Sequence, residues 1–172
     1  IVASGVRGAV CHAHATSRAF EAGDVVTVDY GAMVGGYMSD ITRNFAVGQP
    51  DDRALEVNDL LLRAHRAAAA ALRPGLAGRE ADAIARRIIA EAGYGTNFVH
   101  SLGHGLGLEV HEAPRLSATS KDVLQAGDVV TIEPGIYIEG WGGLRIEDDY
   151  LITQDGAECL TATDNQSLEV VA

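Results

Sequence analysis

The clearest pattern near the start of the chain is an alternation over residues 24–30, where valines alternate with Thr27 and Asp29. A period of two predicts a β-strand, because successive side chains of a strand point to opposite faces. Residues 32–38, with Gly35-Gly36 near their centre, predict a hairpin leading into a second strand through 44–47. Residues 128–138 and 144–153 predict a second pair of strands.

Helical patterns occupy the middle of the chain. A first helix is predicted to begin at Asp51 or Asp52, both suitable N-caps, and to end before Pro74. A second is predicted from about Arg79 to Ala92, with Gly93 after its end. A glycine- and histidine-rich turn region and a short segment near 108–110 follow. Helices that cross between two antiparallel strand pairs predict an α+β fold, with the sheet backed by helices on one side.

An internal repeat links the two strand pairs. Residues 22–29, Ala-Gly-Asp-Val-Val-Thr-Val-Asp, return 104 positions later at 126–133 as Ala-Gly-Asp-Val-Val-Thr-Ile-Glu. Both copies end in an acid, and no low-complexity linker separates them. We therefore expect one domain with pseudo-twofold symmetry. The acids inside the copies, Asp24 and Asp128, are expected to be solvated groups at strand ends.

Composition restricts the class of protein. The 172 residues are 47% hydrophobic and 22% charged, which is typical of a globular domain. A net charge of −11 argues against nucleic acid or an anionic membrane as a partner. With no secretion signal and no long apolar run, we predict a cytoplasmic protein. Cys11 and Cys159 form neither a zinc motif nor a disulfide framework and are expected to be inert.

Acidic residues are placed where they could share one site. The period of two puts Asp29 and Glu133, the last residues of the two copies, on one side of the sheet, and Arg145, Glu147 and Asp149 on a common face. Four carboxylates on an apolar sheet, those of Asp29, Asp40, Glu133 and Glu147, could not all stay ionised without cations. One imidazole, from a histidine between two glycines, completes an oxygen-rich set suited to Mn²⁺, Fe²⁺, Co²⁺ or Zn²⁺.

Five blocks of the sequence together resemble a known family. They are Val28-Asp-Tyr-Gly31, Ser39-Asp-Ile-Thr-Arg43, Gly103-His-Gly-Leu-Gly-Leu-Glu-Val-His-Glu-Ala-Pro-Arg115, Ile132-Glu-Pro-Gly-Ile-Tyr137 and Arg145-Ile-Glu-Asp-Asp149. The chain resembles the pita-bread metallopeptidases, the family of methionine aminopeptidase, aminopeptidase P and prolidase, and it looks most like the X-Pro branch. The resemblance implies the pita-bread fold and a centre of two divalent ions, with manganese the expected metal and cobalt, zinc or iron as alternatives.

The same resemblance assigns roles to individual residues. The ligands would be Asp29, Asp40, His104, Glu133 and Glu147, with Asp40 and Glu147 bridging both ions. Asp29 would serve one ion, and His104 and Glu133 the other. Residues around the ligands match substrate-site histidines and a bracing arginine; they are His12, His100, His111 and Arg145. Tyr137 could contact the substrate or simply pack, whereas His14 and His65 are expected to be ordinary surface or core groups.

The implied activity is hydrolysis of the peptide bond before proline by a hydroxide that bridges two metal ions. Glu133 would carry the proton to the leaving nitrogen, and His111 would stabilise the oxyanion. The substrate would be a peptide with proline at its second position. The blocks favour an Xaa-Pro dipeptidase, and an aminopeptidase P that cleaves longer peptides is the alternative. An amidinohydrolase-like enzyme or a non-catalytic binding module on the same fold is disfavoured by the complete ligand set. An inactive fragment stays an alternative that the ligand set does not address.

Family members usually carry helices, a strand and a further domain before the position of Ile1. We therefore expect residues 1–172 to be a catalytic domain lacking those parts, within a longer protein that forms a homodimer. Cys11 stands where X-Pro relatives usually have proline, so the loop bearing His12 is expected to be looser.

Overall fold

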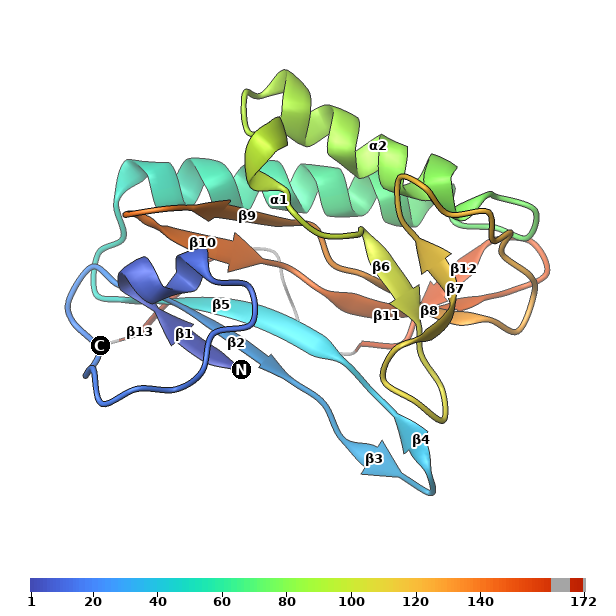
Figure 1. Ribbon diagram of the computed structural model, residues 1–172, viewed down its shortest axis with the longest axis horizontal. Helices are drawn as coiled ribbons and strands as arrows, with labels where there is room; N and C mark the ends of the chain where they lie inside the picture. The colour runs from blue at the N-terminus through green and yellow to red at the C-terminus, as the bar shows by residue number, and fades with distance from the viewer. Residues whose placement is uncertain (162–167, 172) are drawn as a thin grey trace.

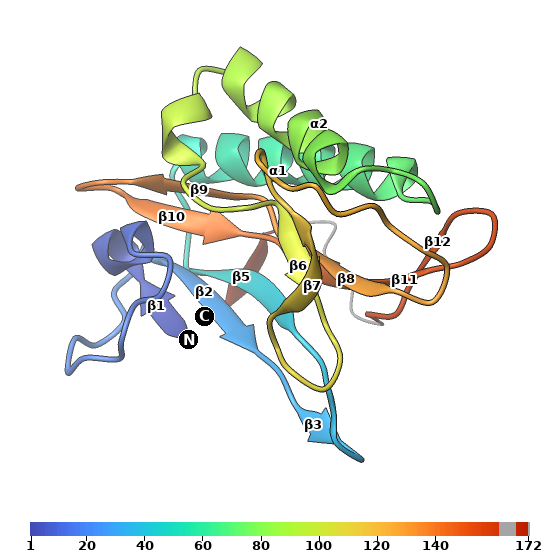
Figure 2. The same cartoon turned by 45° about the vertical axis from the view of Figure 1, so that its right-hand side comes forward.

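The computed structural model describes residues 1–161 and 168–171. Two helices, α1 (Asp52–Ala71) and α2 (Gly78–Glu91), pack against each other and lie on one side of the strands (Figure 1, Figure 2). This arrangement confirms the predicted α+β fold with helices on one face. No helix among the described residues is long and apolar enough to cross a membrane.

The first strand pair lies in a four-stranded sheet with the order β1-β2-β5-β13. Its strands are β1 (Val2–Ser4), β2 (Val25–Tyr30), β5 (Ile41–Val47) and β13 (Glu169–Val171), and the short 3-10 helix η1 (Gly5–Ala9) follows β1. β2 and β5 are antiparallel, with Asp29 opposite Thr42. Between them projects the predicted hairpin, β3 (Met33–Val34) and β4 (Tyr37–Met38). Gly35 and Gly36 turn it with φ of 60° and 88°, a conformation that favours glycine.

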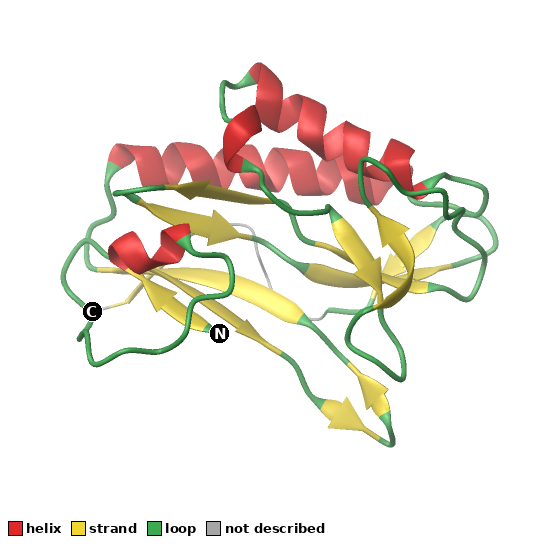
Figure 3. Ribbon diagram, in the orientation of Figure 1, coloured by secondary structure: helices red, strands yellow, loops and turns green. Residues whose placement is uncertain are grey.

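The second strand pair is more interrupted than predicted (Figure 3). Instead of two strands over 128–138 and 144–153, four strands form: β8 (Val129–Ile132), β9 (Gly135–Ile138), β10 (Gly142–Arg145) and β11 (Asp148–Ile152). One interruption coincides with Pro134, which has no N–H to donate to a ladder. Glu133 and Glu147 both lie in the interruptions. The prediction of continuous strands was therefore wrong at two of the candidate ligands.

β9 and β10 form a two-stranded ribbon, and the other strands belong to a sheet with the order β12-β11-β8-β6-β7. Its strand β6 (Gly103–Gly105) falls in the predicted turn region. The strands β7 (Glu112–Leu116) and β12 (Ala157–Cys159) form where no element was predicted. Residues 108–110 form a bend, and a short 3-10 helix, η2 (Gly95–Asn97), follows α2. A Cβ at Gly103 would overlap the Thr131 carbonyl of β8, and one at Gly105 that of Ala113. These glycines therefore allow β6 to lie close to its neighbours.

The helix ends agree with the sequence signals. The Asp51 carboxylate accepts a hydrogen bond of 2.7 Å from the Ala54 N–H, so Asp51 is the N-cap of α1. α2 begins at Gly78, one residue before the prediction, and Gly93 follows it with φ of 89°. The core lies between the helices and the second strand pair, and its largest fully buried side chains include Leu60, Leu61, Ile89, Leu102, Ile132, Ile136 and Leu144.

The acids inside the repeated octapeptides close equivalent turns. Asp24 accepts a bond from the Glu21 N–H, and Asp128 accepts one from the Gln125 N–H. Asp24 is only 8% exposed, since Arg18 holds its carboxylate through contacts of 2.6 and 2.9 Å. The prediction of a solvated Asp24 was therefore wrong, because its partner comes from a loop with no recognisable pattern.

Candidate metal centre

The candidate ligands come from the ends of strands that meet between the two halves of the molecule. Asp29 lies near the end of β2, Asp40 just before β5, and Glu133 just after β8. Glu147 lies between β10 and β11, and His104 lies within β6. Their ligand atoms form two groups, Asp29-Asp40-Glu147 and His104-Glu133-Glu147, in each of which all atoms lie within 4.8 Å of one another. Glu147 belongs to both groups.

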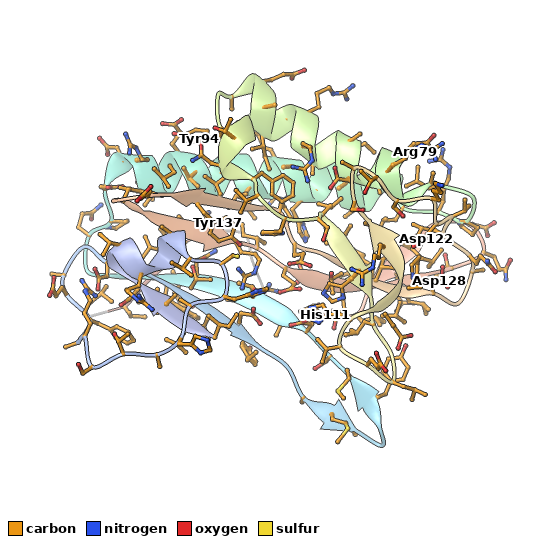
Figure 4. All side chains as sticks on the ribbon, viewed as in Figure 1. Arg79, Tyr94, His111, Asp122, Asp128 and Tyr137 are labelled. Carbon is orange, nitrogen blue, oxygen red and sulfur yellow. The ribbon has the colours of Figure 1, made fainter. Side chains whose placement is uncertain are left out.

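A third group joins Asp40 and His104 to His111. His111 is exposed on the bend between β6 and β7 (Figure 4). Its ring centroid lies 4.3 Å from that of His104. Asp40 and Glu147 are thus the two carboxylates that reach both sides of the cluster.

His104 has the tautomer that a metal ligand needs. Its Nδ1 lies 3.0 Å from the carbonyl oxygen of Gly105, which can only accept, so Nδ1 carries the proton. Burial lowers the pKa of His104, which keeps the ring neutral. Nε2 therefore keeps its lone pair, and it lies 3.3 Å from Oε1 of Glu133 and 3.9 Å from Oδ2 of Asp40.

Without a cation, it is unfavourable for all the carboxylates of the cluster to be ionised together. Burial, with the charges of Asp29 and Asp149, raises the pKa of Asp40 to about 7. Burial also raises the pKa of Glu133 to about 8, and burial with the charges of Glu133 and Asp40 raises that of Glu147 well above its ordinary value. These shifts share one physical cause, since several acids are withdrawn from water into one small volume. A divalent cation would remove that cost.

Donors from neighbouring residues fix the carboxylates. Arg145 Nη2 donates to Asp29 Oδ2 at 2.6 Å, and its Nε donates to the Thr42 hydroxyl at 3.1 Å. The Thr42 hydroxyl in turn donates to Glu147 Oε2 at 2.5 Å. The Asp40 N–H donates to Asp149 Oδ2 at 3.1 Å. The sequence had not assigned roles to Thr42 and Asp149, although both lie in blocks that carry the family resemblance.

His100 and Tyr137 lie behind this network. His100 Nδ1 lies 2.7 Å from the Ser101 carbonyl, so it is the protonated nitrogen, and Nε2 accepts from the Tyr137 hydroxyl at 2.8 Å. That hydroxyl accepts from Arg145 Nη1 at 2.7 Å. Burial lowers the pKa of His100 to about 4. Tyr137 is 7% exposed and comes from β9 (Figure 4), so the geometry favours bracing of Arg145 over substrate contact.

The candidate ligands line one cavity of about 520 Å³. Its wall also contains His12, His100, His111 and Arg145, so all the predicted site residues except Tyr137 line it. Cys11, expected to be inert, lies in the same wall, and His12 is exposed there. The wall includes one cation that the sequence interpretation had not singled out, the exposed Arg115 at the end of the 103–115 block.

Residues 1–154 match the sequence pattern of metallopeptidase family M24. The chain belongs to this family. It is 50% identical over 168 residues to the Xaa-Pro dipeptidase of Pyrococcus furiosus, covering 98% of this chain and 48% of that protein. The chain therefore spans about half the length of that relative.

Solved structures of other M24 proteins have the same architecture. The Xaa-Pro dipeptidase from Bacillus anthracis is 50% identical, with a TM-score of 0.96 over 99% of this chain and 48% of the other. The X-Pro aminopeptidase from Thermotoga maritima is 44% identical, with a TM-score of 0.96 over the same shares. The predicted pita-bread fold is confirmed.

Membership of a metallopeptidase family implies divalent metal ions. The residues of this chain fit such ions, since groups of oxygen and nitrogen donors converge and burial raises the pKa of Asp40, Glu133 and Glu147. The free lone pair on His104 Nε2 points toward the same carboxylates. The cluster is therefore a candidate metal centre by its own chemistry as well as by family.

Proposed function

We propose that this chain is the metal-binding catalytic part of an Xaa-Pro dipeptidase, which hydrolyses the peptide bond before proline. The observation that carries the proposal is the pair of ligand groups that share Glu147 and line the same cavity as His111. Relatives named Xaa-Pro dipeptidase, at about half identity over nearly the whole chain, support the choice of substrate.

The proposed centre holds two divalent ions, with manganese the first metal to test. Asp29, Asp40 and Glu147 would hold one ion, and His104, Glu133 and Glu147 the other, with Asp40 also within reach of the second group. Bound divalent ions lower the pKa of water toward neutrality and polarise a carbonyl oxygen. The two shared carboxylates, Asp40 and Glu147, are the groups suited to bridging.

Protein groups would supply the proton transfer and the charge stabilisation. Glu133, whose Oε1 accepts from the Thr131 hydroxyl at 3.3 Å, would take a proton from the attacking water and deliver it to the proline nitrogen. His111, exposed on the cavity wall, would donate to the oxygen that gains charge as the carbonyl is attacked. Arg145 would keep Asp29 in place, and His12 would contact the substrate from the opposite segment of the wall.

The second candidate is an aminopeptidase P, which would accept longer peptides. It is supported by the likeness to the X-Pro aminopeptidase of Thermotoga maritima. Arg115 favours the dipeptidase, because an exposed guanidinium in the cavity wall suits the free carboxylate that a dipeptide carries next to the scissile bond.

Hydrolysis assays on metal-stripped protein reloaded with Mn²⁺, Co²⁺ or Zn²⁺ test the proposal, with Xaa-Pro and Xaa-Pro-Yaa peptides as substrates. The Asp40→Asn variant should lose metal-dependent cleavage, since it removes a ligand charge at nearly constant volume. Asp59→Asn is the matched control, because the Asp59 side chain is 77% exposed on α1.

Cleavage of the dipeptide in preference to the tripeptide supports the dipeptidase, and the reverse preference supports the aminopeptidase. Two bound ions without cleavage of either peptide would contradict Xaa-Pro hydrolysis by this chain. Failure to bind any of the three metals would favour a non-catalytic binding module.

A further inference from the structure

A buried charged cluster lies behind the candidate metal centre and has no part in the proposed reaction. Arg43 Nη2 lies 2.5 Å from Asp148 Oδ1, and His65 Nε2 of α1 lies 3.1 Å from Asp148 Oδ2. The three side chains are 10%, 4% and 3% exposed. His65 is buried, as expected of a core group, and its neighbour is a buried acid next to Glu147.

The cluster lies where the two halves of the molecule join. β5 belongs to the first sheet and β11 to the second (Figure 2). An isolated bridge joins Thr42 of β5 to Glu147, the residue just before β11. Arg43 Nη1 donates to the carbonyl oxygens of Thr42 at 2.9 Å and Glu147 at 2.7 Å. The Arg43 guanidinium therefore holds the backbones of Thr42 and Glu147 together, and Glu147 is the candidate ligand shared by both groups.

Charge burial of this kind is a poor way to gain stability. Removing an arginine and an aspartate from water costs about as much as their attraction returns, and apolar replacements of a buried pair are often neutral. The buried arginine has a clearer effect on the geometry of its neighbours than on stability. The planar guanidinium donates in fixed directions, and here it contacts Asp148 as well as the carbonyl of Glu147.

We propose that Arg43 is a positioning residue that sets Glu147 relative to Asp40 across the join, with Asp148 and His65 holding the guanidinium in place. Glu147 is common to both ligand groups, so a shift of its backbone would affect both ion sites and above all their bridging. The inference rests on the proposed dinuclear centre but not on any peptide being the substrate.

Two variants separate positioning from charge balance. Arg43→Lys keeps the charge beside Asp148, but a single ammonium cannot reproduce the planar set of contacts. Arg43→Met/Asp148→Leu removes both charges together and so avoids an unpaired buried acid. Arg18→Lys is the matched control, because Arg18, like Arg43, pairs with a mostly buried aspartate, here Asp24, and neither Arg18 nor Asp24 lines the cavity of the candidate centre.

Metal-free protein would be titrated with Mn²⁺ by calorimetry, and the loaded protein examined by electron paramagnetic resonance for coupling between two manganese ions. We expect both Arg43 variants to bind the weaker of the two ions about 10- to 100-fold less tightly than the wild type and to lose the coupled signal. Thermal melting would show that each variant is folded, and Arg18→Lys should match the wild type in both readouts.

Wild-type affinities and coupling in either folded Arg43 variant would overturn the positioning role. A wild-type chain that binds a single ion or gives no coupled signal would remove the dinuclear centre and this inference with it. A coupled wild-type centre that does not cleave Xaa-Pro peptides would contradict the proposed function alone, since metal loading is read without a substrate.

Discussion

At the scale of single residues, the candidate centre is a set of acids that differ in what holds them. A guanidinium donates to Asp29, a hydroxyl donates to Glu147, and the backbone of Ile41 donates to Asp40. Glu133 has the weakest bond, 3.3 Å from the Thr131 hydroxyl. This loose support suits a carboxylate that must gain and lose a proton.

Replacement of Glu133 by Gln is therefore expected to lower kcat by about 100-fold or more at saturating metal, because the amide cannot carry the proton. KM for an Xaa-Pro dipeptide should change much less. Steady-state kinetics at several metal concentrations would separate the loss of proton transfer from weaker metal binding. Glu139→Gln, an exposed acid just beyond β9, is the control. Normal turnover by Glu133→Gln would exclude Glu133 as the proton carrier.

Arg115 should distinguish short from long substrates. Arg115→Met is expected to lower kcat/KM for an Xaa-Pro dipeptide by about tenfold or more, the loss of one charge-assisted hydrogen bond. Cleavage of an Xaa-Pro peptide with an amidated proline should be unaffected, since it has no carboxylate to bind. Equal losses with the free and amidated substrates would show that Arg115 acts elsewhere than at the carboxylate. Arg79→Met on the exposed start of α2 is the control.

At the scale of elements, α2 supports the segment that leads to β6. Arg86 Nη1 and Nη2 donate to the carbonyls of Phe98 and His100 at 2.9 and 2.8 Å. Asp82, fully buried, holds Arg86 through two contacts and accepts from the Leu102 N–H at 3.1 Å. The Leu102 carbonyl then accepts from the Glu133 N–H at 2.8 Å. A helix on the far side of the core is thus connected to the cavity wall.

Asp82→Asn is expected to reduce the free energy of unfolding by about 2 kcal/mol, because the amide loses the charge and its NH2 group, in place of Oδ2, cannot accept from Arg86 Nε. Urea unfolding of metal-loaded protein would measure the change. Asp59→Asn, which affects the exposed Asp59–Arg63 pair of α1 with the same sequence spacing, should cost less than about 0.5 kcal/mol. Equal effects of the two substitutions would mean that α2 does not anchor the 98–102 segment through Asp82.

At the scale of the whole molecule, the two repeat units meet at a cluster of like charges, so folding and metal binding should be linked. In the metal-free protein the pKa of Asp40 is raised to about 7 and that of Glu133 to about 8, both above the ordinary values of 3.8 and 4.5. The stability contributed by such groups is fully present below their unfolded pKa and is lost as pH rises through the folded pKa.

The metal-free chain should therefore melt at a lower temperature at pH 8.5 than at pH 5.5, and metal should restore stability chiefly at the higher pH. Free metal at about 100 times its Kd is expected to add about 2.7 kcal/mol. Differential scanning calorimetry with a chelator or with Mn²⁺ would measure both effects. A metal-free melting temperature that rises over this pH range, or no gain on adding metal at pH 8.5, would contradict the linkage.

The sequence alone determined the features that depend on neighbours along the chain. Both helices, the Asp51 cap and the β3–β4 hairpin follow from local periodicity, capping and turn chemistry. The repeat and the blocks around it also identified the acids that lie together. Their roles as metal ligands stay a prediction.

Tertiary structure decided what depends on residues far apart in the chain. The break at Glu147 and the strand around His104 each involve partners that no local pattern announces. The same holds for the contacts of Arg43 with Glu147 and Asp148, which lie more than 100 positions away. Periodicity specifies which face of an element is apolar, whereas packing of one half against the other determines which polar groups meet between them.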